Sequence, residues 1–193
     1  MRNGKVGIGI VGAGNIAALH ARVIKDLPQA ELIGIYDVKK SWETVLEPMM
    51  INLTILNNSR EKIYLNGFIF ELESIFNNLI SNSKIALDGL NYSKEIKVEI
   101  TNDDEYIYIK YNDNGKGLSD HFKKNPYKIL EPFETDKTNE IGEKIGTGMG
   151  MWIINKTVNE YGGKINLDEN ISCEKGFYIT IILPKEKDEW KCI

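Results

Sequence analysis

The chain has 193 residues, 42% of them hydrophobic and 27% charged, with a formal net charge of −4 at pH 7. This composition is typical of a globular protein with one ordinary domain and an appendage, or with two small domains. The acidic balance disfavours nucleic acid as a partner, and Cys173 and Cys192 lack the spacing of a zinc site. No apolar run is long enough to cross a bilayer. We therefore expect a cytoplasmic protein without membrane contact.

The first forty residues have the pattern of a β-α-β unit. Residues 6–11 predict a buried strand, Gly12 and Gly14 a turn that opens a helix to about Leu27, and residues 31–36 a second strand that ends at Asp37. Glycines at such a turn let the backbone approach a pyrophosphate, and an aspartate after the second strand can accept a hydrogen bond from a ribose hydroxyl. Gly12, Gly14 and Asp37 are therefore candidate dinucleotide-binding residues.

This segment resembles the start of the NAD(P)-binding domain of the glucose-fructose oxidoreductase family, in which a histidine like His20 often follows the glycine turn. The resemblance ends near residue 40, although a dinucleotide site needs further strands to build its crevice. A unit of about 40 residues is also below the size that usually folds alone. We therefore interpret residues 1–40 as an incomplete, vestigial Rossmann-like segment, with His20 as a packing or surface residue; cofactor binding is the alternative.

Composition changes after this segment. Alanine is frequent in the first thirty residues and afterwards recurs only as Ala86, whereas asparagine becomes abundant. We infer a junction at residues 41–49 between sequences of different origin. Beyond it we expect one domain at residues 50–185 and a tail at 186–193.

A long amphipathic helix is predicted within the larger domain. Residues 51–56 and 62–65 indicate short strands, and a helix is expected from Phe70 to about Leu87. Its predicted buried stripe consists of Leu72, Ile75, Phe76, Leu79, Ile80 and Ile85. Asn78 and Asn82 are one turn apart and share a face. They are either surface polar residues or oxygen ligands for Mg²⁺ and its phosphates.

Two glycine clusters follow the helix. Strands predicted at residues 96–101 and 106–112 form an antiparallel hairpin that leads into the sequence D-N-G-K-G at residues 113–117. Asp113 could accept a hydrogen bond from an exocyclic amine, and Gly115 and Gly117 would let a flat base approach the backbone; a simple tight turn is the alternative.

The second cluster, G-T-G-M-G, occupies residues 146–150. It follows E-P-F at 131–133 and a polar stretch that we expect to be a mobile lid carrying Lys137. A helix from Gly148–Gly150 to about Tyr161 would present unpaired N–H groups to a phosphate. Strands at 164–167 and 176–183 would complete the sheet.

These motifs, in this order, resemble the Bergerat-fold ATPases, which include DNA gyrase, MutL repair proteins and histidine kinases. The likeness covers about residues 50–185 and is strongest to the ATP-binding domain of the kinases, which implies a two-layer α/β sandwich with a mixed, mostly antiparallel sheet. The resemblance implies ATP and Mg²⁺ as ligands, with Asn82 holding the metal and Asp113 reading the adenine amine. The ATP-binding residues it implies are Asn78, Asn82, Asp113, Gly115, Gly117, Thr135, Lys137, Gly146, Thr147, Gly148, Met149 and Gly150.

The same resemblance bears on the reaction. The hydrolysing branches carry a glutamate base four residues before the metal-binding asparagine, and this chain has Asn78 there. An amide cannot take a proton from water, so phosphoryl transfer is favoured over hydrolysis. Neither His20 nor His121 lies in a predicted helical hairpin that could serve as phosphoacceptor.

We therefore expect a histidine kinase ATP-binding domain that acts on a histidine of a separate dimerisation domain, with a response regulator as the next partner; a homodimer is left open. One alternative is a non-enzymatic interaction module switched by ATP. A less favoured alternative is a fragment of an NAD(P)-dependent oxidoreductase. The last motif departs from the family pattern because it reads Lys175-Gly176-Phe177 rather than Gly-Thr.

Overall fold

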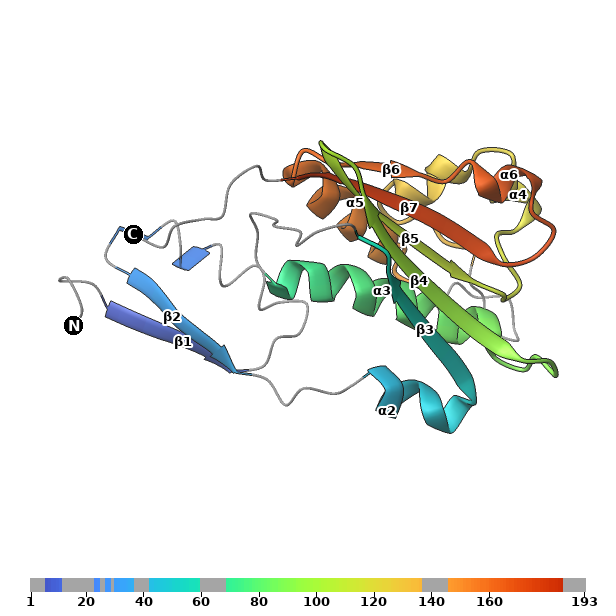
Figure 1. Cartoon of the computed structure of the whole chain (residues 1–193), viewed down its shortest axis with the longest axis horizontal. Helices are drawn as coiled ribbons and strands as arrows, with labels where there is room; N and C mark the ends of the chain where they lie inside the picture. The colour runs from blue at the N-terminus through green and yellow to red at the C-terminus, as the bar shows by residue number, and fades with distance from the viewer. Residues whose placement is uncertain are drawn as a thin grey trace.

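The strands that the structure describes form a two-stranded and a five-stranded sheet (Figure 1). The computed structural model describes residues 6–11, 23–24, 27–28, 30–36, 42–59, 69–136 and 146–185. The larger sheet contains β3 (Ile51–Asn57), β4 (Lys94–Asn102), β5 (Tyr106–Asp113), β6 (Lys164–Asn166) and β7 (Phe177–Pro184) in the order β3-β4-β5-β7-β6. Only β3 and β4 pair in parallel within it, which confirms the expected mixed, mostly antiparallel sheet.

Helices cover one face of the larger sheet. The two long helices, α3 (Ile69–Leu87) and α5 (Gly150–Glu160), lie behind the strands in the view of Figure 1. Burial alternates along β5, where Ile107, Ile109, Tyr111 and Asp113 are buried while the residues between them are at least partly exposed. This alternation is typical of a sheet with one covered and one solvated face, and it gives the two-layer α/β sandwich that we expected.

The buried stripe of α3 differs from the prediction at one position. Ile75, Leu79 and Ile80 are buried in the core, as predicted, whereas Ile85 is 49% exposed. Ile85 lies seven residues, close to two helical turns, after Asn78, so it belongs to the asparagine face of the helix. The prediction was wrong because a spacing of five residues from Ile80 places a side chain on another face.

The predicted junction contains folded elements. Residues 42–49 form α2 (Trp42–Leu46) and the 3₁₀ helix η1 (Glu47–Met49). The ring of Trp42 lies 5.3 Å from that of Phe76, and its Nε1 donates to Asn77 Oδ1 at 3.0 Å. Leu46 is 1% exposed and belongs to the same core as α3. The core of the larger unit thus already includes residues before position 50.

Further short helices surround the sheet. They are α4 (Asp120–Lys123), the 3₁₀ helix η2 (Pro126–Leu130) and α6 (Glu169–Ser172). The sequence pattern did not predict them, because elements of four or five residues show no helical period. No helix of the described ranges is long and apolar enough to cross a membrane.

The smaller sheet pairs β1 (Val6–Val11) with β2 (Ala30–Tyr36) in parallel. A parallel pair is what the predicted β-α-β unit requires. Its predicted functional positions, Gly12, Gly14 and Asp37, lie outside the described residues, as do His20 and the strand predicted at 62–65.

Candidate functional site

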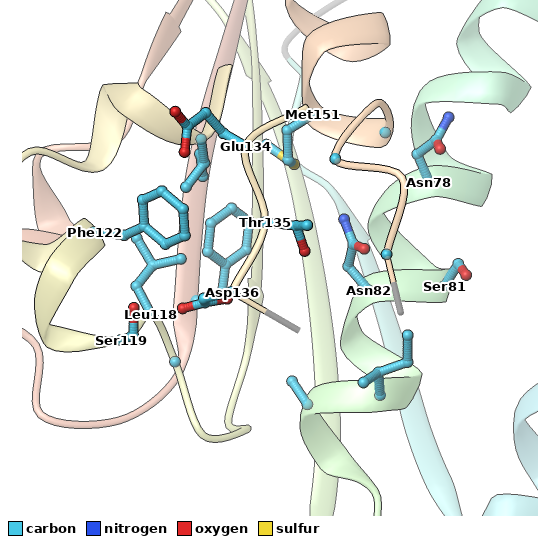
Figure 2. Close-up of a pocket in the computed structure, with 18 of the residues that line it drawn as sticks. Asn78, Ser81, Asn82, Leu118, Ser119, Phe122, Glu134, Thr135, Asp136 and Met151 are labelled. Atoms are coloured by element: carbon cyan, nitrogen blue, oxygen red, sulfur yellow. The ribbon is translucent and has the colours of Figure 1, made fainter. Parts of the chain in front are cut away.

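A pocket of about 350 Å³ lies where α3, the end of β5 and the start of α5 come together (Figure 2). It brings together nine of the twelve predicted ATP-binding residues: Asn78, Asn82, Asp113, Gly117, Thr135, Gly146, Thr147, Gly148 and Gly150. Gly115 and Met149 do not line it, and Lys137 lies outside the described residues. Motifs that lie far apart in the sequence therefore share one cavity.

One face of α3 forms a wall of the pocket. Asn78, Ser81, Asn82, Ile85 and Ala86 line it, and Figure 2 labels Asn78, Ser81 and Asn82 on this helix. Of these five residues, only the two asparagines were predicted to belong to the site. Helical spacing of three, seven and eight residues from Asn78 identifies the other three, so the periodic pattern of the helix already indicated them.

The amide of Asn78 is oriented within the helix. Its Nδ2 donates to the carbonyl oxygen of Ser74 at 2.8 Å. A Cβ added at Gly150 would lie 3.0 Å from Asn78 Oδ1, so the amide oxygen faces the first residue of α5. Asn78 therefore presents an oxygen, not a nitrogen, to the pocket at the place where α5 begins.

Asp113 ends β5 and lies at the floor of the pocket. It is 1% exposed, its Oδ2 accepts a hydrogen bond from the Ser83 hydroxyl, and its Oδ1 accepts the N–H of Gly115 at 2.9 Å. Burial raises the pKa of Asp113, and the hydrogen bonds from Ser83, Gly115 and the backbone of Phe177 oppose that rise. The carboxylate is thus fixed in direction while it still borders the cavity.

The turn after Asp113 is held by close backbone packing. Gly117 has φ +72°, and a Cβ there would lie 2.7 Å from the carbonyl oxygen of Gly176. The N–H of Gly176 donates to Gly115 O at 2.9 Å. A Cβ on Gly115 would lie 2.8 Å from the Cβ of Ala86. Gly115 therefore packs the turn against α3 and is not among the residues that line the pocket.

Gly176, in the motif Lys175-Gly176-Phe177, packs beneath the pocket. Gly176 has φ +84°, a conformation that L-residues other than glycine rarely adopt, and it packs on the backbone of Asp113. Phe177 pairs with Asp113 in the sheet register and lines the pocket. The motif at Lys175–Phe177 thus supports the floor of the site although it departs from the family pattern.

The second glycine cluster forms the opposite end of the pocket. Gly148 has φ +64°, and a Cβ there would collide with the backbone of Phe133 and lie 2.7 Å from the nitrogen of Glu134. Met149 does not line the pocket, and its N–H donates to Thr147 Oγ1 at 3.4 Å. α5 begins next to this loop, with no side-chain cap on its N-cap residue. Its first turn therefore offers N–H groups and the positive end of the helix dipole to an anion.

Acidic and polar residues of the 134–136 segment also border the cavity. Glu134, Thr135 and Asp136 line it, and Lys128 forms an ion pair with Glu134 at 3.7 Å. No lysine or arginine is among the lining residues in the part of the chain that the structure describes. Backbone N–H groups, side-chain amides and a bound cation would therefore have to balance an anionic ligand.

The donor set suits Mg²⁺ better than a metal held by the protein alone. The described residues contain no cluster of three or more histidine, cysteine or acidic side chains that could hold a metal ion. Amide oxygens of Asn78 and Asn82 are hard donors, and Mg²⁺ is usually held by one or two protein oxygens together with substrate phosphates and waters. The residues present fit a magnesium ion that arrives with a nucleotide.

An apolar surface completes the pocket. It is lined by Leu118, Phe122, Ile129, Met151 and Phe177. Phe122 and Ile129 are 3% and 6% exposed, so they form a fixed wall. No sequence pattern identified Phe122 and Ile129, because α4 and η2 reach the pocket only through the tertiary fold. Such a wall beside one buried acceptor suits a flat, mostly apolar ring.

Comparison with known proteins agrees with this geometry. The family model described as "Histidine kinase-, DNA gyrase B-, and HSP90-like ATPase" matches residues 69–187. Sporulation kinase A of Bacillus subtilis is 31% identical over 142 residues, which cover 70% of this chain and 20% of that protein. The sensor histidine kinase GacS of Pseudomonas protegens is 25% identical over 158 residues, which cover 79% of this chain and 17% of GacS. The chain thus spans about a fifth of the length of these relatives.

Solved structures show the same fold. The mycobacterial sensor histidine kinase MprB superposes with a TM-score of 0.55 at 19% identity, over 76% of this chain and 90% of that structure. The catalytic domain of the histidine kinase ThkA gives a TM-score of 0.55 at 22% identity, over 75% of this chain and 86% of that domain. The larger sheet and its helices therefore have the architecture of histidine kinase catalytic domains.

Proposed function

The chain belongs to the histidine kinase-, DNA gyrase B- and HSP90-like ATPase family and carries an ATP-binding domain of the histidine kinase branch; from this we propose that it binds ATP with Mg²⁺ and transfers the γ-phosphate to a histidine on a separate domain. One observation carries the proposal. A single pocket has a buried carboxylate, Asp113, at one end and the start of α5, beside Asn78, at the other.

The adenine is proposed to bind at the Asp113 end. A carboxylate accepts a hydrogen bond from an exocyclic amine, and the fixed orientation of Asp113 directs that acceptor into the cavity. Phe122 and Ile129 would enclose the faces of the ring and keep water away from this bond. The base would thus be recognised by one polar contact in apolar surroundings.

The phosphates are proposed to lie at the start of α5. The N–H groups of residues 148–150 and the helix dipole would stabilise their charge, and Thr147 could donate its hydroxyl. Asn82 is proposed to hold Mg²⁺ through its amide oxygen, with Asn78 contacting the phosphates or their metal waters. Lys137, which follows the pocket residues 134–136 in the sequence and lies outside the described residues, would add a positive charge.

Transfer is favoured over hydrolysis by the residue at position 78. An asparagine stands where hydrolysing relatives carry a glutamate base, and its Nδ2 is bonded to Ser74 O at 2.8 Å. An amide cannot accept a proton from water, so the nucleophile must come from elsewhere. We propose a histidine of a phosphoacceptor domain, followed by a response regulator, as in two-component signalling.

His121 is not proposed as the acceptor. It lies in α4, a helix of four residues, with its Nε2 3.2 Å from Lys128 Nζ. We propose further that the ATP-binding unit begins at α2 and not at residue 50, because Leu46 is buried in its core. The Rossmann-like segment at residues 1–40 and the tail at 186–193 remain outside that unit in this proposal.

Phosphate transfer from labelled ATP to an isolated dimerisation-domain helix of a related kinase tests the reaction. We expect transfer by the wild-type chain, loss in Asn82→Ala and retention in Asn159→Ala, which removes an exposed helical asparagine of α5 that bonds Asn155. ATP binding without transfer to any acceptor would support the ATP-switched interaction module instead. Absence of ATP binding would contradict both.

A further inference from the structure

A buried chain of hydroxyl groups lies behind the floor of the pocket. The Tyr111 hydroxyl is 2.7 Å from Ser83 Oγ, and Ser83 Oγ is in turn hydrogen-bonded to Asp113 Oδ2. All three residues are 1% exposed. Asp113 borders the cavity, whereas Tyr111 and Ser83 do not. The two hydroxyl residues can therefore influence a bound base only through Asp113.

The direction of each hydrogen bond in this chain is fixed by chemistry. Burial raises the pKa of Tyr111 far above its usual value, so its phenol keeps its proton. An ionised carboxylate can only accept, so the single Ser83 proton is donated to Asp113. The Tyr111 proton must then be donated to Ser83 Oγ. The three groups thus form a relay of hydrogen bonds in which Tyr111 donates to Ser83 and Ser83 donates to Asp113.

The relay limits what Asp113 can still accept. Its Oδ2 takes the Ser83 proton, its Oδ1 takes the Gly115 N–H at 2.9 Å, and the backbone of Phe177 also bonds the carboxylate. A carboxylate offers about four acceptor positions. Only about one of them is therefore left for a ligand, and the side chain cannot rotate without breaking buried hydrogen bonds.

We propose that Tyr111 and Ser83 are positioning residues that restrict Asp113 to one donor from the base and thereby select adenine over guanine nucleotides. Adenine offers a single exocyclic amine beside a ring acceptor. Guanine offers two adjacent donors, which a free carboxylate would accept as a pair, and a carbonyl oxygen, which a carboxylate repels. The inference rests on the proposed ATP site and adds the origin of its base selectivity.

The test compares ATP and GTP affinities, each with Mg²⁺, by calorimetric titration of the full chain. Tyr111→Phe removes only the hydroxyl, and Ser83→Ala removes the central link. We expect the wild type to bind ATP at least about tenfold more tightly than GTP. Ser83→Ala should lower that ratio by about tenfold, as loss of a hydrogen bond to a charged group predicts, and Tyr111→Phe, which removes a hydrogen bond between neutral groups, by about fivefold. GTP binding should fall less than ATP binding.

Tyr108→Phe is a matched control on the same strand. Its hydroxyl donates to Asp103 Oδ2 at 2.7 Å, so the variant also removes a tyrosine–aspartate hydrogen bond, but away from the pocket. Its ATP-to-GTP ratio should equal that of the wild type. A merely structural role of Tyr111 would alter the thermal midpoint and leave the ratio unchanged.

The possible results distinguish the inference on base selectivity from the proposed ATP-binding function. An unchanged ratio in a folded Tyr111→Phe or Ser83→Ala protein overturns the inference, and so does a wild type that binds GTP as tightly as ATP, whichever variants fold. Wild-type binding of ATP that Asp113→Asn weakens would still support the proposed function in these cases. A wild type that binds neither nucleotide would overturn the proposed function together with the inference.

Discussion

The two ends of the pocket are built in different ways. At the proposed base end, side chains decide the geometry, because Asp113, Ser83 and Tyr111 are each 1% exposed and Ser83 is hydrogen-bonded to both of the others. At the phosphate end, the backbone decides it, because Gly148 and Gly150 leave room that a Cβ would fill. The base end should therefore be sensitive to loss of polar atoms, and the phosphate end to addition of atoms.

Asp113→Asn should have the largest effect on nucleotide affinity. It replaces a charged acceptor that faces the cavity, and hydrogen bonds to charged groups contribute about 1.5–3 kcal/mol, so the Kd for ATP should rise about 10- to 100-fold. Calorimetric titration with ATP and Mg²⁺ measures this change.

Two control variants separate the site from the rest of the chain. Asp103→Asn removes a carboxylate that also accepts backbone N–H groups and a tyrosine hydroxyl, but on an exposed turn. His20→Ala changes the segment to which we assign no ATP role. Both should bind ATP like the wild type. Equal losses in Asp113→Asn and either control would contradict the assignment of the base end.

Gly148→Ala should break the phosphate end. The added Cβ would collide with the backbone of Phe133, so the loop must move and its N–H groups with it. We expect the affinity for ATP to fall by about tenfold, since misplaced phosphate contacts are individually strong. The measurement is again titration with ATP and Mg²⁺, alongside the thermal midpoint without nucleotide.

Gly89→Ala is the matched control for that variant. Gly89 has φ +70°, close to the φ +64° of Gly148, but a Cβ there would meet nothing within 4 Å. Both variants therefore share the strain of a left-handed residue, and only one has the collision. If both lowered ATP affinity equally, backbone strain and not the loop position would explain the effect.

The sequence predicted the phosphate end better than the base end. Glycine clusters and a helix start are local signals, and the predicted helix start at Gly148–Gly150 lies within two residues of the observed start of α5 at Gly150. The base end depends on pairing between distant segments, which brings Ser83 of α3 to Tyr111 and Asp113 of β5. No periodicity reports such a contact, and Ser83 was therefore missed.

For the fold too, local signals were predicted well and features that depend on tertiary packing were not. Long periodic elements such as α3 and the β4–β5 hairpin were predicted within a few residues of their ends. Short elements were missed, among them α2 within the predicted junction, because its burial of Leu46 depends on tertiary contacts with the core. Hydrophobic periodicity thus predicts the long helices and strands, whereas the apolar wall of the pocket depends on how these elements pack together.

The pH dependence of stability should distinguish two aspartates. Burial raises the pKa of Asp113 from 3.8, so the folded state binds the proton more tightly and this stabilisation is lost as pH rises through the raised pKa. The Tyr108 hydroxyl and backbone N–H groups lower the pKa of Asp103, so its contribution is present above pH 3.8 and lost as pH falls through the lowered pKa.

Denaturant unfolding across this pH range measures both contributions. The difference in free energy of unfolding between wild type and Asp113→Asn should decrease as pH rises above 3.8. The corresponding difference for Asp103→Asn should increase as pH rises toward 3.8. Slopes of the same sign would show that burial does not control the titration of Asp113.

Tyr161→Phe should have the smallest effect on nucleotide binding. The Tyr161 hydroxyl donates to Glu71, a residue that is 5% exposed, and this bond joins the start of α3 to the end of α5. Removing the hydroxyl should lower the free energy of unfolding by about 1–3 kcal/mol and leave ATP affinity unchanged. A parallel loss of affinity would mean that the pocket depends on this distant contact.

The most direct test of the account is the thermal midpoint of the wild-type chain with ATP and Mg²⁺, compared with NAD. At a hundredfold excess over its Kd, a ligand stabilises the folded state by about 2.7 kcal/mol. We predict that ATP with Mg²⁺ raises the midpoint, that NAD does not, and that Asp113→Asn reduces the rise by about half or more at the same ATP concentration. A rise with NAD alone, or no rise with ATP, would contradict the account.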